Sequence, residues 1–126
     1  MKLLVVESDS LMGEALQIGL GSIGFRSDRV KTSRAALAAL RLTTTYRLVV
    51  LDAQLPLPDV SGVVARCRGL ATPIPVLLLT KRGPHDGPAP ATESEGDALL
   101  AKPVDLTDLD RMIRQLIGTA ASFRPS

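Results

Sequence analysis

The sequence predicts an α/β fold, built as a doubly wound five-stranded parallel sheet with helices on both faces. Short apolar runs alternate with helical patterns along the chain, which is the element order of such folds. The runs are apolar throughout, as strands covered on both faces are. The chain has 126 residues, about the modal length of one domain, and can bury a core without a disulfide or metal.

Four runs have the length and composition of buried strands, and a weaker one suits the edge of the sheet. The weaker run, residues 26–30, has the sequence RSDRV and is mostly polar, as edge strands often are. The buried runs are residues 3–6, 48–51, 76–79 and 98–101. Polar residues, proline or glycine flank each run and mark its ends.

Helices are predicted after four of these runs, because apolar residues recur there at the spacing of one helix face. Their side-chain N-caps are expected at Asp9 or Ser10, Ser33, Asp59 and Thr107. The last helix is expected to end at Gly118, since glycine readily adopts the conformation that closes a helix.

One crossover lacks a helical pattern. Between the runs at 76–79 and 98–101 lies TKRGPHDGPAPATESEGD, with three prolines and three glycines. These residues disfavour a regular helix over 83–90. Helix 4 of the doubly wound sheet is therefore expected to be degraded or absent.

Residues 19–24, GLGSIG, match the glycine pattern of dinucleotide-binding loops. Such a loop follows a strand and opens a helix, so that the helix N-terminus faces the pyrophosphate. Here the glycines close a predicted helix and lead into a strand. They are interpreted as a helix end and turn.

Composition favours a soluble cytoplasmic protein. The single cysteine, Cys67, excludes an internal disulfide, and no apolar run approaches the ~20 residues of a membrane span. Cys67 itself is interpreted as a buried helix residue. A net charge of +2 does not require a nucleic-acid partner. Residues 26–47 carry six Lys or Arg and one Asp, and a solvated surface is favoured over a binding patch.

Polar residues stand at the carboxyl ends of four predicted strands. They are Glu7, Ser8 and Asp9, then Asp52, Thr80 and Lys102. In a flavodoxin-like sheet of order 2-1-3-4-5, these ends meet in one cleft. Carboxylates there can hold a hard cation such as Mg²⁺, and an aspartate can act as a nucleophile towards phosphorus. A lysine would neutralise charge on the transferred group.

The segments LLVVES, LVVLDAQLP, PVLLLT and LLAKP stand at the ends of these strands, in that order. With them, nearly the whole sequence resembles the receiver domain of bacterial two-component response regulators. LDAQLP and PVLLLT are most similar to the winged-helix (OmpR-type) subfamily, whose receivers precede a DNA-binding domain. The resemblance implies a signalling domain rather than an enzyme.

The resemblance also implies a role for each residue of the cleft. Asp52 would accept phosphate, with a sensor histidine kinase as the candidate donor. Glu7, Asp52 and the backbone carbonyl of Gln54 would bind Mg²⁺. Thr80 would be the switch hydroxyl. Lys102 would contact the phosphoryl group, and the peptide bond that follows it would be cis.

On this interpretation the receiver domain covers residues 1–118. Residues 119–126 form a tail or the start of a linker to an effector domain not present here. DNA would be contacted only through that domain, no membrane is involved, and a homodimer is left open.

The sequence departs from the family pattern at strand one. Ser8 stands where the family has a second acid, the one that usually ligates Mg²⁺ directly. Weak Mg²⁺ binding and slow phosphorylation are therefore expected. Asp9 is not expected to substitute, because adjacent strand residues point to opposite faces.

Other departures concern the switch and the dimer face. Lys81 follows the switch threonine, where the family has a small residue, and Leu99 replaces the switch aromatic. The family's dimer face uses ion pairs, for which Asp97 and Arg114 remain. The sequence has apolar residues at two positions that are usually charged, Ala98 and Met112.

Two hypotheses follow. The leading one is an atypical receiver domain that regulates transcription, with Asp52 as phosphoacceptor. The alternative is a pseudo-receiver, a phosphorylation-independent dimerisation, interaction or ligand-sensing module. Ser8, Lys81, Leu99 and the degraded helix 4 favour the alternative. Asp52, Thr80 and Lys102 favour the conventional role.

Overall fold

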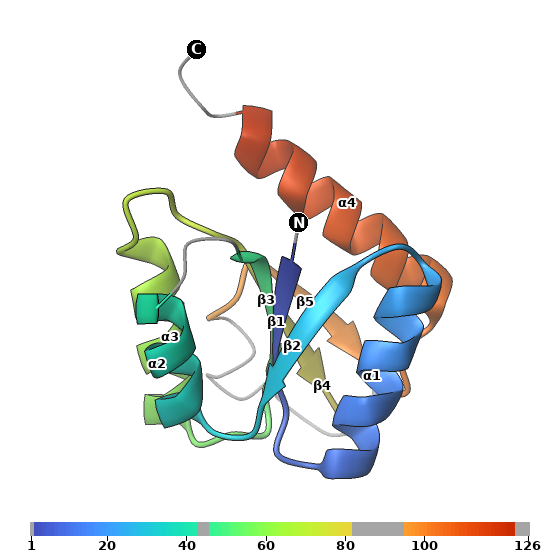
Figure 1. Ribbon diagram of the computed structural model, residues 1–126, viewed down its shortest axis with the longest axis horizontal. Coiled ribbons are helices and arrows are strands. Elements are labelled where there is room, and N and C mark those ends of the chain that lie inside the picture. The colour runs from blue at the N-terminus through green and yellow to red at the C-terminus, as the bar shows by residue number, and fades with distance from the viewer. Residues whose placement is uncertain (1, 43–45, 82–94, 123–126) are drawn as a thin grey trace.

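The computed structural model describes residues 2–42, 46–81 and 95–122, which form a three-layer α/β arrangement (Figure 1). The central layer is a five-stranded sheet in the order β2-β1-β3-β4-β5, and every adjacent pair of strands is parallel. The predicted fold class and strand order are confirmed. No helix among the described residues is long and apolar enough to cross a membrane.

The strands lie where the apolar runs predicted them. They are β1 (Lys2–Val6), β2 (Arg26–Val30), β3 (Tyr46–Asp52), β4 (Val76–Thr80) and β5 (Ala98–Ala101). The three central strands are almost completely buried, because helices cover both faces of the sheet. The edge strand β2 is half-buried, which explains why its sequence tolerates charges.

Four helices cover the two faces. They are α1 (Ser10–Ser22), α2 (Ser33–Leu42), α3 (Leu57–Arg68) and α4 (Leu106–Ser122). One apolar core lies between the sheet and α2 with α3, and a second lies between the sheet and α1 with α4. Figure 1 shows that α4 continues past the edge at which the strands begin.

The cap of α1 is confirmed, because Asp9 Oδ1 accepts a hydrogen bond from the backbone N–H of Met12 at 3.0 Å. The residues that cap α2 and α4 lie upstream of the predicted ones. Thr32 Oγ1, rather than Ser33, accepts from the N–H of Ala35 at 3.1 Å. Asp105, rather than Thr107, caps α4: its Oδ1 accepts from the N–H groups of residues 107 and 108.

The predicted cap at Asp59 is also wrong. Helix α3 begins at Leu57 with Pro56 as N-cap, so Asp59 lies inside the first turn. In each of these helices another residue upstream can start the helix, and the tertiary path of the chain selects it. A carboxylate inside the first turn still stabilises the helix N-terminus electrostatically.

The end of α4 differs from the prediction as well, because the helix passes Gly118 and continues to Ser122. Glycine costs about 1 kcal/mol relative to alanine inside a helix but does not stop it. The predicted loss of helix 4 concerns residues 82–94, which lie outside the described residues. The helix labelled α4 is the one that follows β5.

The glycine-rich segment 19–24 forms the end of α1 and a turn, as interpreted from the sequence. Gly24 has a φ of 96°, the left-handed region that glycine favours. A Cβ at Gly19 would lie 2.8 Å from Leu106 Cδ2, so this glycine lets α4 start close to α1.

Candidate functional site

The carboxyl ends of β1, β3, β4 and β5 bring together the four residues singled out from the sequence. Lys102 Nζ lies 2.8 Å from Glu7 Oε1 and 3.2 Å from Asp52 Oδ1. The backbone N–H of Lys102 donates to the carbonyl of Thr80 at 2.7 Å, which fixes β5 against β4. The peptide bond between Lys102 and Pro103 is cis.

The three charged side chains of this cluster are almost inaccessible to water. Their exposed fractions are 2% for Glu7, 6% for Asp52 and 4% for Lys102. Buried charges are costly unless they are paired. The ammonium of Lys102 neutralises only one of the two carboxylate charges, so the cluster keeps a formal charge of −1. This negative charge favours the binding of a cation.

The protonation of Lys102 reflects a balance of opposing effects. Burial disfavours the charged ammonium and on its own would lower the Lys102 pKa. The hydrogen bond to Glu7 and the negative charges of Asp52 and Glu7 outweigh burial, so the pKa lies above its ordinary value of 10.5. Lys102 is therefore a cation at neutral pH.

Backbone hydrogen bonds orient both carboxylates. Glu7 Oε2 accepts from the N–H of Asp9 at 3.2 Å, and Asp52 Oδ1 accepts from the N–H of Gln54 at 2.9 Å. Asp52 Oδ1 thus has two donors, whereas Oδ2 accepts no hydrogen bond from the described residues. The second oxygen of Asp52 is the one available to a ligand or an electrophile.

Ser8 and Asp9 do not add a carboxylate to this cluster. The side chain of Ser8 is exposed, and that of Asp9 caps α1 through the N–H of Met12. This hydrogen bond lowers the pKa of Asp9. The prediction that Asp9 does not replace the missing acid agrees with this geometry.

The donor set is suited to a hard cation but is small. Carboxylate oxygens of Glu7 and Asp52 are ligands that Mg²⁺ prefers. Among the described residues, no group of three or more His, Cys, Asp or Glu could hold a metal ion. The residues therefore fit Mg²⁺ with one carboxylate fewer than an acid at position 8 would supply.

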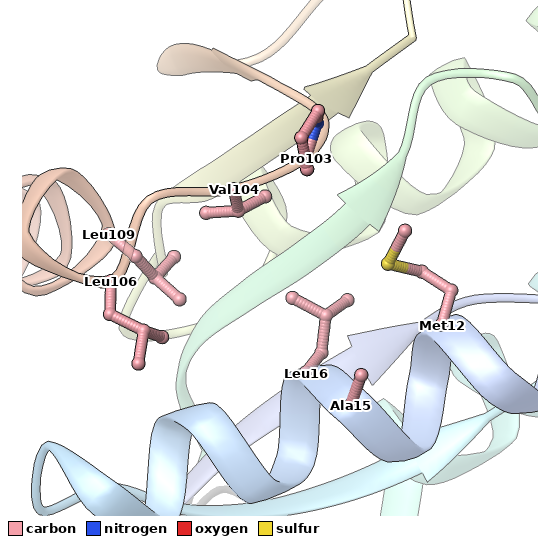
Figure 2. Close-up of a pocket in the computed structure, with 7 residues that line it drawn as sticks. All are labelled: Met12, Ala15, Leu16, Pro103, Val104, Leu106 and Leu109. Atoms are coloured by element: carbon pink, nitrogen blue, oxygen red, sulfur yellow. The ribbon is translucent and has the colours of Figure 1, made fainter.

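A second feature near the cluster was missed by sequence reasoning. An apolar cavity of about 230 Å³ lies between α1 and the start of α4, beside the loop that follows Lys102 (Figure 2). Met12 and Leu16 line it from α1, and Pro103 and Val104 line it from the loop. The helical spacing of the α1 segment did not predict the gap between α1 and α4. Two apolar residues of that segment, Leu11 and Ile18, are 80% and 67% exposed.

The departures from the family pattern occupy different environments. Lys81 is exposed at the end of β4, and Leu99 is 39% exposed on β5. Ala98 and Met112 are partly buried against the core beneath α1 and α4, which explains why uncharged residues stand there. Cys67 is buried as expected, and burial raises the pKa of its thiol to about 12.

The two charges expected at a dimer face both have partners within the chain. Asp97 Oδ2 accepts from the N–H of Val76 at 2.7 Å, and its Oδ1 lies 4.0 Å from Arg68. Arg114 pairs with Asp110 at 2.6 Å and lies over the ring of Phe25, on the α1 side. Both side chains remain partly exposed, 38% for Asp97 and 61% for Arg114.

The sequence of the chain is similar to that of known transcriptional regulatory proteins. QseB, a transcriptional regulatory protein of Haemophilus influenzae, is 36% identical over 126 residues. The match covers 100% of this chain and 57% of that protein, so the chain spans little more than half of the relative's length. No protein-family model matches the chain.

Several solved structures with the same fold are receiver domains. A response regulator receiver protein from Burkholderia phymatum superposes with a TM-score of 0.75 and 28% identity, covering 93% of this chain and 94% of that one. The receiver domain of the Pseudomonas aeruginosa sensor histidine kinase PA1611 also gives a TM-score of 0.75, at 22% identity, covering 93% of this chain and 97% of that one. That structure has a magnesium ion in its active site cleft.

Proposed function

The chain is a receiver domain of the OmpR-type response regulators, and from this premise we propose that Asp52 is its phosphoacceptor. The single observation that carries the proposal is the buried cluster in which Lys102 lies within 3.2 Å of both Asp52 and Glu7. The cytoplasmic signal would come from a sensor histidine kinase. The output would be regulation of transcription through an effector domain attached to the receiver.

The chemistry assigned to Asp52 is a phosphoryl transfer. Its Oδ2 attacks the phosphorus of a phosphohistidine and forms a P–O bond, while the P–N bond breaks and its electron pair stays on the imidazole nitrogen. Asp52 Oδ1 is held by Lys102 and the N–H of Gln54, so the carboxylate is oriented before the reaction. Lys102 then neutralises part of the charge on the phosphoryl oxygens.

Mg²⁺ would be held by the carboxylates of Glu7 and Asp52 and by the backbone carbonyl of Gln54. When bound, it neutralises negative charge on the transferring phosphoryl group. The magnesium ion in the PA1611 receiver cleft supports this assignment. Ser8 offers a neutral hydroxyl in place of a carboxylate, so affinity for the ion would be low.

Thr80 would bind a phosphoryl oxygen after transfer and so report the modification to the rest of the domain. It is 4% exposed and follows Leu79, the residue paired with Asp52 in the sheet. A receiver responds only if phosphorylation favours one of two conformations. Leu99 in place of an aromatic means that the second conformation must be stabilised by other contacts.

The pseudo-receiver alternative is less well supported. The relatives that match over the full chain are transcriptional regulatory proteins, and the acceptor, lysine and threonine positions are all present. The sequence changes that favour the alternative affect the rim of the cluster rather than the contact between Lys102 and Asp52.

The experiment is incubation of the 126-residue chain with acetyl phosphate and Mg²⁺, followed by intact mass measurement. We expect a phosphate adduct that forms slowly, needs high Mg²⁺ and is abolished by Asp52→Ala. Asp59→Asn is the matched control, because it removes a carboxylate in the first turn of α3 and should leave the adduct unchanged.

The absence of an adduct at high Mg²⁺ would contradict the proposal and favour a phosphorylation-independent module. An adduct that persists in Asp52→Ala would show that another residue is the acceptor.

A further inference from the structure

We propose that the amino-terminal edge of the sheet, on the side covered by α2 and α3, contacts the phosphate backbone of duplex DNA. Three exposed arginines define this amino-edge basic surface: Arg26, Arg41 and Arg66. The inference rests on the proposed function, because it places the receiver beside DNA that an effector domain binds.

The fold places these arginines, which come from three elements, at the same edge of the sheet. Arg26 is the first residue of β2 and is paired with Lys2, the first residue of β1. Arg41 and Arg66 lie in the last turns of α2 and α3. Both helices run antiparallel to the strands, so they end at the edge where the strands begin (Figure 1).

Side-chain direction places Arg26 on the same side as the two helices. Residues two apart on a strand point to the same face, so Arg26 points to the face of Asp28. Asp28 accepts a hydrogen bond from the hydroxyl of Tyr46. Tyr46 is part of the core that α2 and α3 cover, so Arg26 lies on the same face of the sheet as these helices.

The three arginines are not neutralised within the described residues. Other arginines have acidic neighbours: Arg68 lies near Asp97, and Arg111 and Arg114 pair with acids on their own helix. No ion pair of the described residues includes Arg26, Arg41 or Arg66.

Two acids near this edge, Asp28 and Asp97, already have partners. Asp28 Oδ2 accepts from the Tyr46 hydroxyl at 2.6 Å and lies 3.2 Å from Lys2 Nζ. Asp97 accepts from the N–H of Val76. Because these carboxylates are occupied, the positive charge of the three arginines faces solvent.

The tertiary structure changes the interpretation of the basic stretch at residues 26–47. Its cations do not form one patch, because Lys31 and Arg34 lie at the opposite end of α2 from Arg41. The surface combines two residues of this stretch with Arg66, which is distant in sequence. Composition alone favoured a solvated surface because it could not show this grouping.

Each arginine also has a local role, but those roles do not require the grouping. A cation in the last turn of a helix interacts with the helix dipole, by about 0.3–1 kcal/mol. A charge on an edge strand discourages strand pairing. Neither effect requires that three unpaired guanidinium groups lie at the same edge. Binding to successive phosphates uses such a grouping, and the planar guanidinium group matches the geometry of a phosphate.

Duplex DNA fits this surface better than single-stranded nucleic acid. Non-specific single-strand binding uses aromatic side chains as stacking platforms, and aromatics are only 2% of this chain. Helix α4 ends at the same edge of the sheet, on the face opposite to α2 and α3 (Figure 1). An effector domain joined to the chain after α4 would hold its DNA at this edge, near these arginines.

The test is fluorescence anisotropy of the 126-residue chain with a labelled duplex of about 30 base pairs, over a series of salt concentrations. Three phosphate contacts predict a slope of about −2.7 for log K against log salt. Arg41→Glu with Arg66→Glu should weaken binding at least tenfold and flatten the slope by about 2.

The matched control is Lys31→Glu with Arg34→Glu, which changes net charge equally at the other end of α2. It should retain most of the affinity. Equal loss in both variants would overturn the proposal, since net charge alone would then explain binding. Equal competition by poly-glutamate and unlabelled duplex would also overturn it, in favour of an acidic protein partner.

The wild-type chain must bind the duplex at low salt, and failure to do so would overturn the proposal too. Urea denaturation should show that both double variants remain folded. Asp52→Ala should bind the duplex as the wild type does. A failed phosphorylation experiment and a failed DNA experiment are thereby distinguishable.

Discussion

The two edges of the sheet carry charge in opposite ways. At the carboxyl edge, Glu7, Asp52 and Lys102 are buried together, and ion pairs between them offset the cost of removing their charges from water. At the amino edge, Lys2 and Asp28 are about 40% exposed and are solvated as well as paired. A charge at the carboxyl edge therefore carries a large desolvation cost unless it is paired. A charge at the amino edge carries little such cost, because water solvates it.

This difference follows from the direction of the chain. Among the described residues, β1, β2, β3 and β5 each end in a loop that enters a helix, so several loops converge at the carboxyl edge. The backbone N–H groups of Asp9 and Gln54 in those loops orient Glu7 and Asp52. At the amino edge the helices end, and the long side chains of Arg41 and Arg66 extend into solvent.

The largest effect is expected when the buried cation is removed. Lys102→Met leaves Glu7 and Asp52 without compensation, so the free energy of unfolding should fall by about 3–5 kcal/mol. Urea denaturation at neutral pH without divalent cations measures it.

The control for this prediction is Lys81→Met, an exposed lysine near the same edge, which should change stability by no more than about 0.5 kcal/mol.

The folded pKa of Lys102 lies above 10.5, so its contribution to stability is complete below pH 10.5 and is lost as the pH rises through the folded value. Similar small losses in both variants would show that the buried ion pairs do not stabilise the fold.

The next effect concerns the missing acid. Ser8→Asp should strengthen Mg²⁺ binding by about tenfold, or 1.4 kcal/mol, since it adds a carboxylate at the end of β1. Isothermal titration with Mg²⁺ measures the change, with Ser10→Asp as a control outside the cluster. Unchanged affinity in Ser8→Asp would mean that residue 8 does not face the ion.

A smaller effect is expected for the helix cap beside the cluster. Asp9→Ala should lower the free energy of unfolding modestly, because the N–H of Met12 loses its side-chain acceptor. The same titration should show unchanged Mg²⁺ affinity. A large loss of affinity would instead place Asp9 among the metal ligands and weaken the contrast with Ser8.

The smallest effect at neutral pH is expected at the amino edge. Burial, together with the hydrogen bond to Asp28 and its charge, raises the pKa of Tyr46 to about 12. Absorbance of tyrosinate reports it directly, because the chain has one tyrosine. Asp28→Asn should lower the midpoint towards the ordinary value of 10.0.

The sign of the stability change with pH follows from these shifts. Tyr46 favours the folded state below its ordinary pKa of 10.0, and this contribution is lost as the pH rises towards 12. The Tyr46 hydroxyl, together with Lys2, lowers the pKa of Asp28, so that contribution is present above pH 3.8 and lost on acidification. A midpoint unchanged by Asp28→Asn would show that burial alone sets the tyrosine pKa.

Local sequence patterns predicted the elements better than their ends. The five strands and the four described helices follow from apolar runs and helical spacing, and the strand order follows from the flavodoxin-like fold class. The caps at Ser33, Asp59 and Thr107 and the stop at Gly118 were wrong. Several neighbouring residues can start or end a helix at similar free energy, and the packing of the helix against the sheet decides among them.

The candidate site was predictable in membership but not in geometry. Strand ends in a parallel sheet meet at one edge, which placed Glu7, Asp52, Thr80 and Lys102 together before any coordinates. The sequence could not show that one ammonium contacts both carboxylates, or that Asp52 Oδ2 accepts no hydrogen bond from the described part of the chain. It also missed the cavity beside Pro103, which depends on how α4 packs against α1.

The sequence by itself determined the α/β class, the buried strands and the identity of the polar residues at their ends, because periodicity and strand direction are local properties. Only the tertiary structure decided which charges meet. Lys102 is separated by 95 residues from Glu7 and by 50 from Asp52, and Arg26, Arg41 and Arg66 come from three elements. Such groupings depend on the register of strands and the packing of helices, which no local pattern encodes.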